Sequence, residues 1–360
     1  MGLSEKKEHL PGLDVFRIML ALLVFCFHSL SNGCSYTGIL NPFVSMGAIS
    51  MTGFFMLSGF SLFYNYGDKD LTYLGNISTF YKKRIISIFP IYWIVALVYV
   101  LVRVVLKGAD IIENIILAPI EFLGIQSAFN SLFSVSHNNG TWFISCIAIS
   151  YLLFPLIANI IKQLKFKYKL VLFFVLSAII IYSPFIVKEF NLSGIYDNPF
   201  FRSLEFTVGV LLASMMEKLS SMKLCVNVLF HWMSALIEFI VMIVLVSVGI
   251  MLNFGINNYM MYNFICIPMF SLMLITLSGV RSEVVKKSSI IKYMSSASYV
   301  FFLSQLFCWQ PTRWILQTLN INNNLITILL SFSVCSVMAV FLHSVLEKPI
   351  TRFLNKKFIK

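Results

Sequence analysis

The sequence predicts an all-α, polytopic integral membrane protein with about ten transmembrane helices and both termini in the cytoplasm. Three observations predict this fold class. Hydrophobic residues make up 59% of the 360 residues, and the mean hydropathy is +0.86. Charged residues make up only 12%, whereas an ordinary soluble domain has roughly 25%. The apolar residues are also gathered into runs of about 20, the length that a helix needs to cross a bilayer.

Ten such runs follow one another along the chain, with short polar segments between them. Their approximate bounds are 13–31, 46–64, 86–106, 141–161, 169–187, 200–216, 226–251, 260–280, 297–317 and 324–346. The apolar stretch 111–123 is shorter and contains Glu113, Pro119 and Glu121, so we expect it to be interfacial. Because no linker or soluble appendage separates the runs, residues 1–360 are expected to form one membrane-embedded domain.

The distribution of positive charge predicts the orientation. If the N-terminus is inside, 21 of the 27 Lys and Arg residues fall in inner segments, as the positive-inside rule requires. The net charge of +12 does not indicate nucleic-acid binding, since no basic stripe with interleaved aromatics lies outside the apolar runs. We therefore expect a multi-pass protein of the plasma membrane that contacts lipid and no nucleic acid.

The seven cysteines and five histidines show no spacing typical of metal ligands, so no metal site is expected. Four of the histidines have no partner that the sequence indicates, and we expect them to be structural or solvated. They are His9, His137, His231 and His343.

The first run contains three side chains that lipid disfavours: Asp14, Arg17 and His28. Arg17 and His28 are 11 residues apart, or about three helical turns, so they share a face about 16 Å apart. Asp14 and Arg17 form an i,i+3 pair that can partly neutralise its charges. Histidine accepts a proton near neutral pH, which makes His28 a candidate general base on the outer side. A snorkelling arginine and a hydrogen-bonded core histidine are the alternatives.

Three other polar positions are candidates for function. Glu205 begins the sixth run at the outer level and could orient His28, or it could pair with Arg202. Arg84, at the inner start of the third run, could reach a phosphate or serve as a positive-inside anchor. Ser58 lies beside glycines that allow close helix packing or leave room for a bound chain.

Seven short segments carry a resemblance that extends over nearly the whole chain. They are 13–17 (LDVFR) with His28, 54–60 (FFMLSGF), 84–90 (RIISIFP), Trp142 with 151–155 (YLLFP), 202–206 (RSLEF), 298–299 (SY), and 347–349 (EKP) with Arg352. In this order they resemble the membrane acyltransferase-3 family, which O-acylates bacterial surface polysaccharides, lipopolysaccharide, Nod factors and peptidoglycan. The chain departs from the pattern at Ser87, where a second arginine is usual, at Ile147 and Ala148 in place of an acidic pair, and at Gln305 in place of a late histidine.

The resemblance implies transfer of an acyl group, usually acetyl from acetyl-CoA, across the bacterial cytoplasmic membrane. The acceptor would be a hydroxyl of an extracytoplasmic glycan or lipid-linked sugar, acyl-CoA would be the co-substrate, and no bound cofactor is expected. His28 and Glu205 are the expected catalytic residues, Arg17, Arg84 and Ser58 are expected to bind the donor, and Asp14, Arg202 and Trp142 are expected to support the site.

Two other classes of function also fit many spans with intramembrane charge. A transporter of polysaccharide or lipid-linked sugar would move its substrate without consuming acetyl-CoA. A non-enzymatic partner of a polysaccharide synthase would bind the synthase and would not depend on His28.

Overall fold

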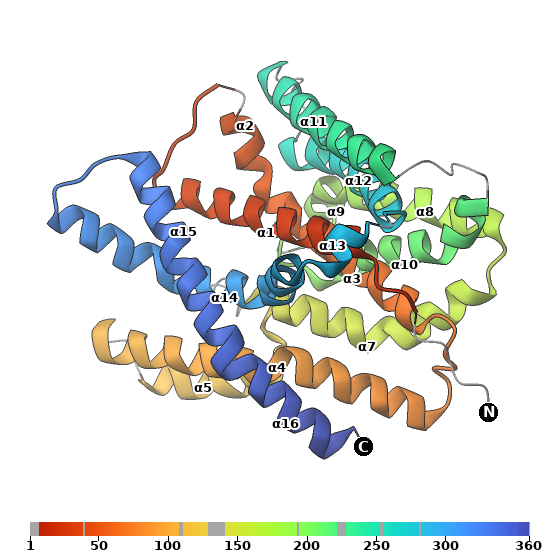
Figure 1. Cartoon of the computed structure of the whole chain (residues 1–360), viewed down its shortest axis with the longest axis horizontal. Coiled ribbons are helices and arrows are strands. Elements are labelled where there is room, and N and C mark those ends of the chain that lie inside the picture. The colour runs from red at the N-terminus through yellow and green to blue at the C-terminus, as the bar shows by residue number, and fades with distance from the viewer. Residues whose placement is uncertain are drawn as a thin grey trace. The chain divides into compact units, whose positions relative to one another are not determined.

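The computed structural model describes residues 7–38, 40–107, 111–128, 141–192, 194–221, 228–252, 255, 257–280 and 282–359. Within these ranges the regular structure is helical and no strand occurs (Figure 1). This is the expected outcome for apolar runs in lipid, because a helix satisfies every backbone N–H and C=O within its own segment. The prediction of an all-α polytopic membrane protein is confirmed.

Each of the ten predicted apolar runs coincides with a helix. The long helices are α1 (Pro11–Ser31), α3 (Ser50–Tyr66), α4 (Leu74–Lys107), α7 (Trp142–Gln163), α8 (Phe166–Ile181), α10 (Pro199–Ser221), α11 (Val228–Leu252), α12 (Asn258–Ser278), α14 (Ser289–Thr318) and α15 (Asn324–Phe341). The shorter elements are α2 (Leu40–Ser45), α5 (Ile111–Leu123), α9 (Ser183–Glu189), α13 (Glu283–Lys287), α16 (Lys348–Phe358), two 3-10 turns (Met46–Ile49 and Gln126–Ala128) and a π turn (Leu342–Glu347).

Not every long helix is apolar enough to be counted as a crossing. In the described part of the chain, seven helices are long and apolar enough to cross a membrane, and the number is eight if the bent pair α8 and α9 is one span. The pair bends by 60°. The predicted runs 200–216 and 297–317 correspond to α10 and α14, which are not among these helices, and α10 carries the charged Arg202 and Glu205. Crossings through α10 and α14, and the location of both termini, stay predictions.

Several helix ends are explained by local chemistry. Pro11 occupies the first turn of α1, where its missing N–H costs nothing. Gly33 follows the end of α1 with a φ of 83°, a conformation that glycine adopts without strain. The side chain of Asn257 accepts hydrogen bonds from the backbone N–H groups that begin α12, and Asn323 caps α15 in the same way.

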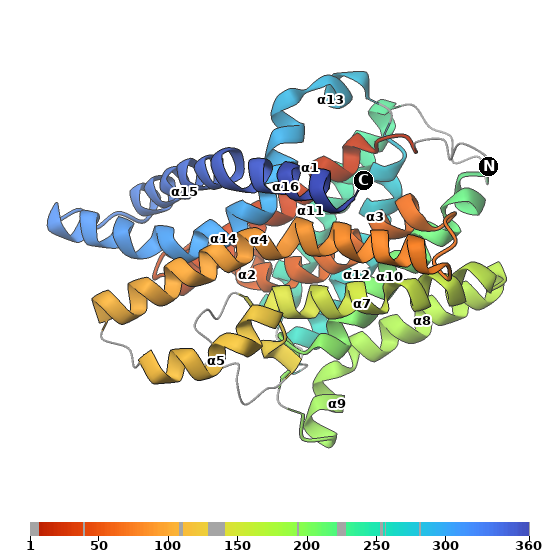
Figure 2. The same ribbon diagram turned by 90° about the horizontal axis from the view of Figure 1, so that it is seen from below.

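The chain folds into two compact units, each built from separate stretches of sequence. Unit 1 consists of Met1–Lys69, Ile157–Ile186 and Leu204–Ser298, and unit 2 consists of Asp70–Leu156, Val187–Ser203 and Tyr299–Lys360. In unit 1, α1 packs on α3 and α12, and α11 lies alongside α12. In unit 2, α4 packs against α5 and α16 (Figure 2). The single domain expected from the sequence stays a prediction.

Large apolar side chains face outward on the helices that are long and apolar enough to cross a membrane. Leu236 and Ile237 of α11 are 58% and 56% exposed, and Val337 of α15 is 71% exposed. In water such surfaces would be unfavourable, whereas in a bilayer they contact acyl chains. The outward apolar faces therefore agree with the membrane environment that the composition predicts.

Candidate active site

The polar residues of α1 lie where the sequence predicts, on one uninterrupted helix. Asp14 is buried, and Arg17 and His28 are half-buried. Because α1 is continuous from Pro11 to Ser31, the separation of about 16 Å between Arg17 and His28 along one face follows from helix geometry.

Ser295 of α14 joins Asp14 and Arg17 into one network. Its Oγ donates to Asp14 Oδ1 at 2.6 Å and accepts a hydrogen bond from Arg17 Nη1 at 3.2 Å. Ser295 is 2% exposed and its bond to Asp14 is buried, whereas its bond to the half-buried Arg17 is partly exposed. The two charges of α1 are thus tied together by a third residue that lies 281 residues from Asp14 in sequence, and no short-range pattern could have indicated it.

The second oxygen of Asp14 contacts His9, which the sequence analysis left without a partner. His9 Nε2 lies 2.7 Å from Asp14 Oδ2. The sequence indicated no partner for His9, because this contact depends on how the chain turns into α1 and brings His9 beside Asp14 in the first turn. Asp14 therefore uses one oxygen for α14 and the other for the segment that precedes α1.

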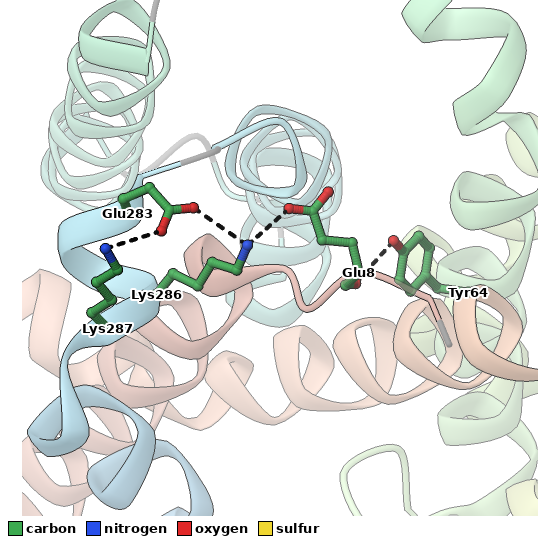
Figure 3. Close-up of polar contacts among 5 residues, drawn as sticks. All are labelled: Glu8, Tyr64, Glu283, Lys286 and Lys287. Atoms are coloured by element: carbon green, nitrogen blue, oxygen red, sulfur yellow. Dashed lines mark hydrogen bonds and ion pairs between the residues drawn. The ribbon is translucent and has the colours of Figure 1, made fainter. Parts of the chain in front are cut away.

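That preceding segment is held by further polar contacts in unit 1 (Figure 3). Lys286 Nζ of α13 lies 3.3 Å from Glu8 Oε1 and 3.3 Å from Glu283 Oε1, and Lys287 Nζ lies 3.8 Å from Glu283 Oε2. The Tyr64 hydroxyl of α3 donates to the Glu8 carbonyl oxygen at 3.0 Å. Exposed pairs of this kind are individually weak, but together they connect three elements at the start of α1.

His28 lies in the last turn of α1, close to the point where the helix ends. Its carbonyl oxygen accepts a hydrogen bond from Asn32 Nδ2 at 2.8 Å, and its ring centroid lies 5.9 Å from that of Phe27. The neighbouring Ser29 hydroxyl contacts the Tyr36 hydroxyl at 2.8 Å, which ties the following loop to the helix end. The position suits an acid–base group at one end of the span, and its pairing with Glu205 stays a prediction.

Glu205 is a buried carboxylate on α10, with 1% of its surface exposed. Thr52 of α3 donates to Glu205 Oε1 at 2.9 Å. Two glycines bring these helices close together. A Cβ on Gly59 would lie 1.9 Å from the Phe206 carbonyl oxygen, and a Cβ on Gly209 would lie 1.9 Å from the Met56 carbonyl oxygen. The close approach of α3 and α10 therefore positions Glu205.

Ser58, the neighbour of Gly59, is half-buried on α3. The glycine contacts show that this segment of α3 packs closely against α10. Close helix packing is one of the two interpretations that the sequence offered for the segment. The role of Ser58 in donor binding stays a prediction.

In unit 2, Arg202 is fully buried between aromatic rings. Its guanidinium carbon lies 5.5 Å from the ring centroid of Trp142 and 5.3 Å from that of Tyr196, and its Nε donates to the Tyr196 carbonyl oxygen at 2.8 Å. Such cation–π contacts stabilise a desolvated guanidinium. Asp197 follows in the same loop, where burial raises the pKa of its carboxyl and the nearby Arg202 partly opposes that rise. Trp142 and Arg202 thus hold the loop that leads into α10.

Arg84 of α4 also lies against aromatic rings in unit 2. Its guanidinium carbon is 5.9 Å from the centroid of Phe80 and 5.8 Å from that of Tyr151. Ser87, which replaces the usual second arginine of the resembled pattern, donates its hydroxyl to the Arg84 carbonyl oxygen at 2.9 Å. The Ser87 hydroxyl is therefore bonded within its own helix, and it does not supply the positive charge of the usual second arginine.

A second histidine that the sequence left unpartnered also has an acidic neighbour. His343 Nδ1 forms a short hydrogen bond with Glu347 Oε2 inside the π turn, and His343 is 3% exposed. The Tyr299 hydroxyl donates to the Ile88 carbonyl oxygen at 3.2 Å and lies near enough to Glu347 to interact electrostatically. The i,i+4 spacing of His343 and Glu347 was a signal that could have found this pair. His137 lies outside the described residues.

Among the residues that the structure describes, no group of three or more His, Cys, Asp and Glu side chains could hold a metal ion. The chemistry available in the described site is that of hydroxyls, carboxylates, guanidinium groups and imidazole.

Comparison with known proteins identifies the family to which the chain belongs. The sequence profile of the family described as "Acyltransferase domain" matches residues 10–345. Acyltransferase MdmB of Streptomyces mycarofaciens is 26% identical over 228 residues, which cover 57% of this chain and 57% of that relative. The chain thus spans little more than half the length of this relative. No solved structure shows significant similarity. Because the profile covers nearly the whole chain, this membrane protein belongs to the acyltransferase-domain family.

Proposed function

We propose that the protein is a membrane O-acyltransferase that moves an acyl group, acetyl in the first instance, from acyl-CoA at the cytoplasmic side. The acceptor is a hydroxyl of an extracytoplasmic glycan or lipid-linked sugar. Family membership supports acyl transfer, and the positive-inside distribution of charge supports this direction. The membrane would be the bacterial cytoplasmic membrane.

The observation that carries the proposal is the arrangement of α1. One end of the helix holds Arg17 in a hydrogen-bond network with Ser295 and Asp14, and the other end holds His28. A fixed guanidinium is suited to bind phosphate. The pantetheine arm of coenzyme A can cover a substantial part of the roughly 16 Å between the two levels. The donor phosphates and the acceptor hydroxyl can therefore be bound at opposite ends of one helix.

The proposed chemistry is general-base catalysis by His28. Its imidazole takes the proton of the acceptor hydroxyl as that oxygen bonds to the acyl carbon. The carbon–sulfur bond then breaks, and coenzyme A leaves as a thiolate that takes up a proton. Brief transfer of the acyl group to His28 itself is the alternative form of the same role. Glu205, held by Thr52, would orient or stabilise the imidazolium.

The remaining residues have supporting roles in the proposal. Arg17 and Arg84 bind the donor, and Ser58 lies along its path. Asp14 fixes Arg17, while Trp142 and Arg202 shape the loop on the acceptor side.

The proposal is tested with purified protein in liposomes, supplied with radiolabelled acetyl-CoA on one side and hydroxyl acceptors on the other. We expect His28→Ala to reduce the rate of acyl transfer by at least about a hundredfold, the lower range for a general base. The elution volume of the variant in size-exclusion chromatography and its unfolding temperature should equal those of the wild type. His231→Ala is the matched control and should remain active. A folded His28→Ala protein with full activity would refute the assignment.

A cellular measurement identifies the acceptor. Deleting the gene and weighing the cell-surface glycans should reveal a loss of mass equal to one acyl unit. Translocation of a glycan that proceeds without acetyl-CoA would instead indicate a transporter, and binding to a synthase that is unaffected by His28→Ala would indicate a non-enzymatic partner.

A further inference from the structure

Helix α16 is a basic helix that continues directly from the last membrane-spanning helix. Lys348, Arg352, Lys356 and Lys357 lie within its 11 residues, and no acidic residue occurs between Lys348 and Phe358. Its neighbours in unit 2 are α4 and the π turn Leu342–Glu347. Glu347 interacts with Lys348, whereas neither α16 nor α4 contains an Asp or Glu that could neutralise Arg352 and Lys356.

The length of the helical segment places α16 beyond the hydrocarbon core. The segment Asn324–Phe358 has 35 residues, which corresponds to about 52 Å at 1.5 Å per residue. A hydrocarbon core is about 30 Å thick, and a typical tilt of about 20° shortens the projected length only slightly. Residues 324–346 contain no Lys, Arg, Asp or Glu and are long enough to span. The charged segment then begins at the level of the lipid headgroups, and long basic side chains farther along it can reach back toward phosphate.

The faces of α16 divide by chemistry. Lys348, Arg352 and Lys356 recur every four residues and so share one face, and Arg352 and Lys356 are exposed. Phe353, beside them, is 64% exposed. Ile350 and Leu354 lie on the opposite side and are half-buried. A basic face at the end of a spanning helix is typical of segments that contact the headgroups of anionic lipids.

We propose that the exposed face of α16 binds the headgroups of anionic phospholipids, with Arg352 and Lys356 contacting phosphate. Charge complementarity selects an anionic lipid over a zwitterionic one. This surface is independent of the proposed acyl transfer and of every residue assigned to it.

Native mass spectrometry of the full chain, released from mixed micelles of phosphatidylglycerol and phosphatidylcholine, tests the proposal. The wild type should retain phosphatidylglycerol preferentially, and retention should fall as salt is raised. Arg352→Gln/Lys356→Gln should lower phosphatidylglycerol retention by about tenfold or more. Lys286→Gln/Lys287→Gln in α13 removes the same charge from another helix, where Lys287 is exposed and Lys286 is half-buried, and should leave retention unchanged.

Each remaining outcome overturns the proposal. Equal retention by the α16 variant and the wild type would exclude a lipid site on this helix, and equal loss in the α13 variant would reduce it to a general charge effect. Displacement of the lipid by acetyl-CoA would reassign the cations to the donor, and displacement by an acidic protein would reassign them to a protein partner. Because no residue of α16 is buried, the variant should fold. The salt dependence of the wild type gives a test that needs no substitution.

Discussion

Replacing Ser295 by alanine tests whether Arg17 is held in place through α14. The Ser295 hydroxyl is the shared partner of two charged side chains, at 2.6 Å from Asp14 Oδ1 and 3.2 Å from Arg17 Nη1. Alanine removes both hydrogen bonds and leaves a small void at a position that is 2% exposed. The carboxylate of Asp14 would keep His9 as a partner.

The magnitude follows from the kind of bond that is lost. A hydrogen bond to a charged group contributes about 1.5–3 kcal/mol in a protein interior, whereas side-chain bonds measured in a membrane bundle average about 0.6 kcal/mol. We expect the free energy of unfolding to fall by about 1–3 kcal/mol. If about 1.4 kcal/mol of that appears as lost donor binding, the KM for acyl-CoA rises about tenfold, while kcat changes less.

Thermal unfolding in detergent and initial rates at varied acyl-CoA measure the two effects separately. Ser304→Ala is the matched control, because Ser304 is a buried serine of the same helix whose hydroxyl donates only to the carbonyl oxygen of Val300, at 2.8 Å. The reasoning is refuted if Ser295→Ala is no more destabilising than Ser304→Ala and leaves the KM for acyl-CoA unchanged. A loss of stability without a change in KM would show that the network is structural and that Arg17 does not bind the donor.

Gly59→Ala should destabilise the protein by about 1–3 kcal/mol, because the new Cβ would lie 1.9 Å from a backbone carbonyl oxygen of α10 that cannot move alone. Gly249→Ala, whose Cβ would meet only the flexible side chain of Met261, should cost less than about 1 kcal/mol, and equal unfolding temperatures for the two variants would contradict the close packing. Burial raises the pKa of Asp197 above its usual value of 3.8, so the folded state holds the proton more tightly and stability should fall as pH rises above about 4. Asp197→Asn should flatten this part of the stability profile, and an unchanged slope in unfolding experiments from pH 4 upward would disprove the assignment.

Local sequence features predicted the helices because hydropathy and helix periodicity act over neighbouring residues. Each of the ten apolar runs coincides with a helix, and the spacing of Arg17 and His28 needed only the pitch of α1. The number of membrane-spanning helices follows less directly from the sequence. Helices α10 and α14 are long but less apolar than the other spans, since they also carry charged and polar side chains.

The partners of the site residues could not be predicted in the same way. Thr52 and Glu205 are separated by 153 residues in sequence, and nothing in either segment indicates that the hydroxyl reaches that carboxylate. His9 and His343, for which the sequence analysis named no partner, show both cases. The His343–Glu347 spacing was visible within one helix, whereas the contact of His9 with Asp14 depends on how the chain turns into α1.

The sequence by itself determined that this chain is a helical membrane protein, and that α1 carries an arginine and a histidine about three turns apart. These properties follow from composition and from short-range periodicity. The tertiary structure decided which groups satisfy the buried charges. Ser295 reaches Asp14 across 281 residues, and α3 and α10 approach closely where glycines allow it. The reason is physical: a buried polar group must find a partner, and which partner it finds depends on how the helices pack.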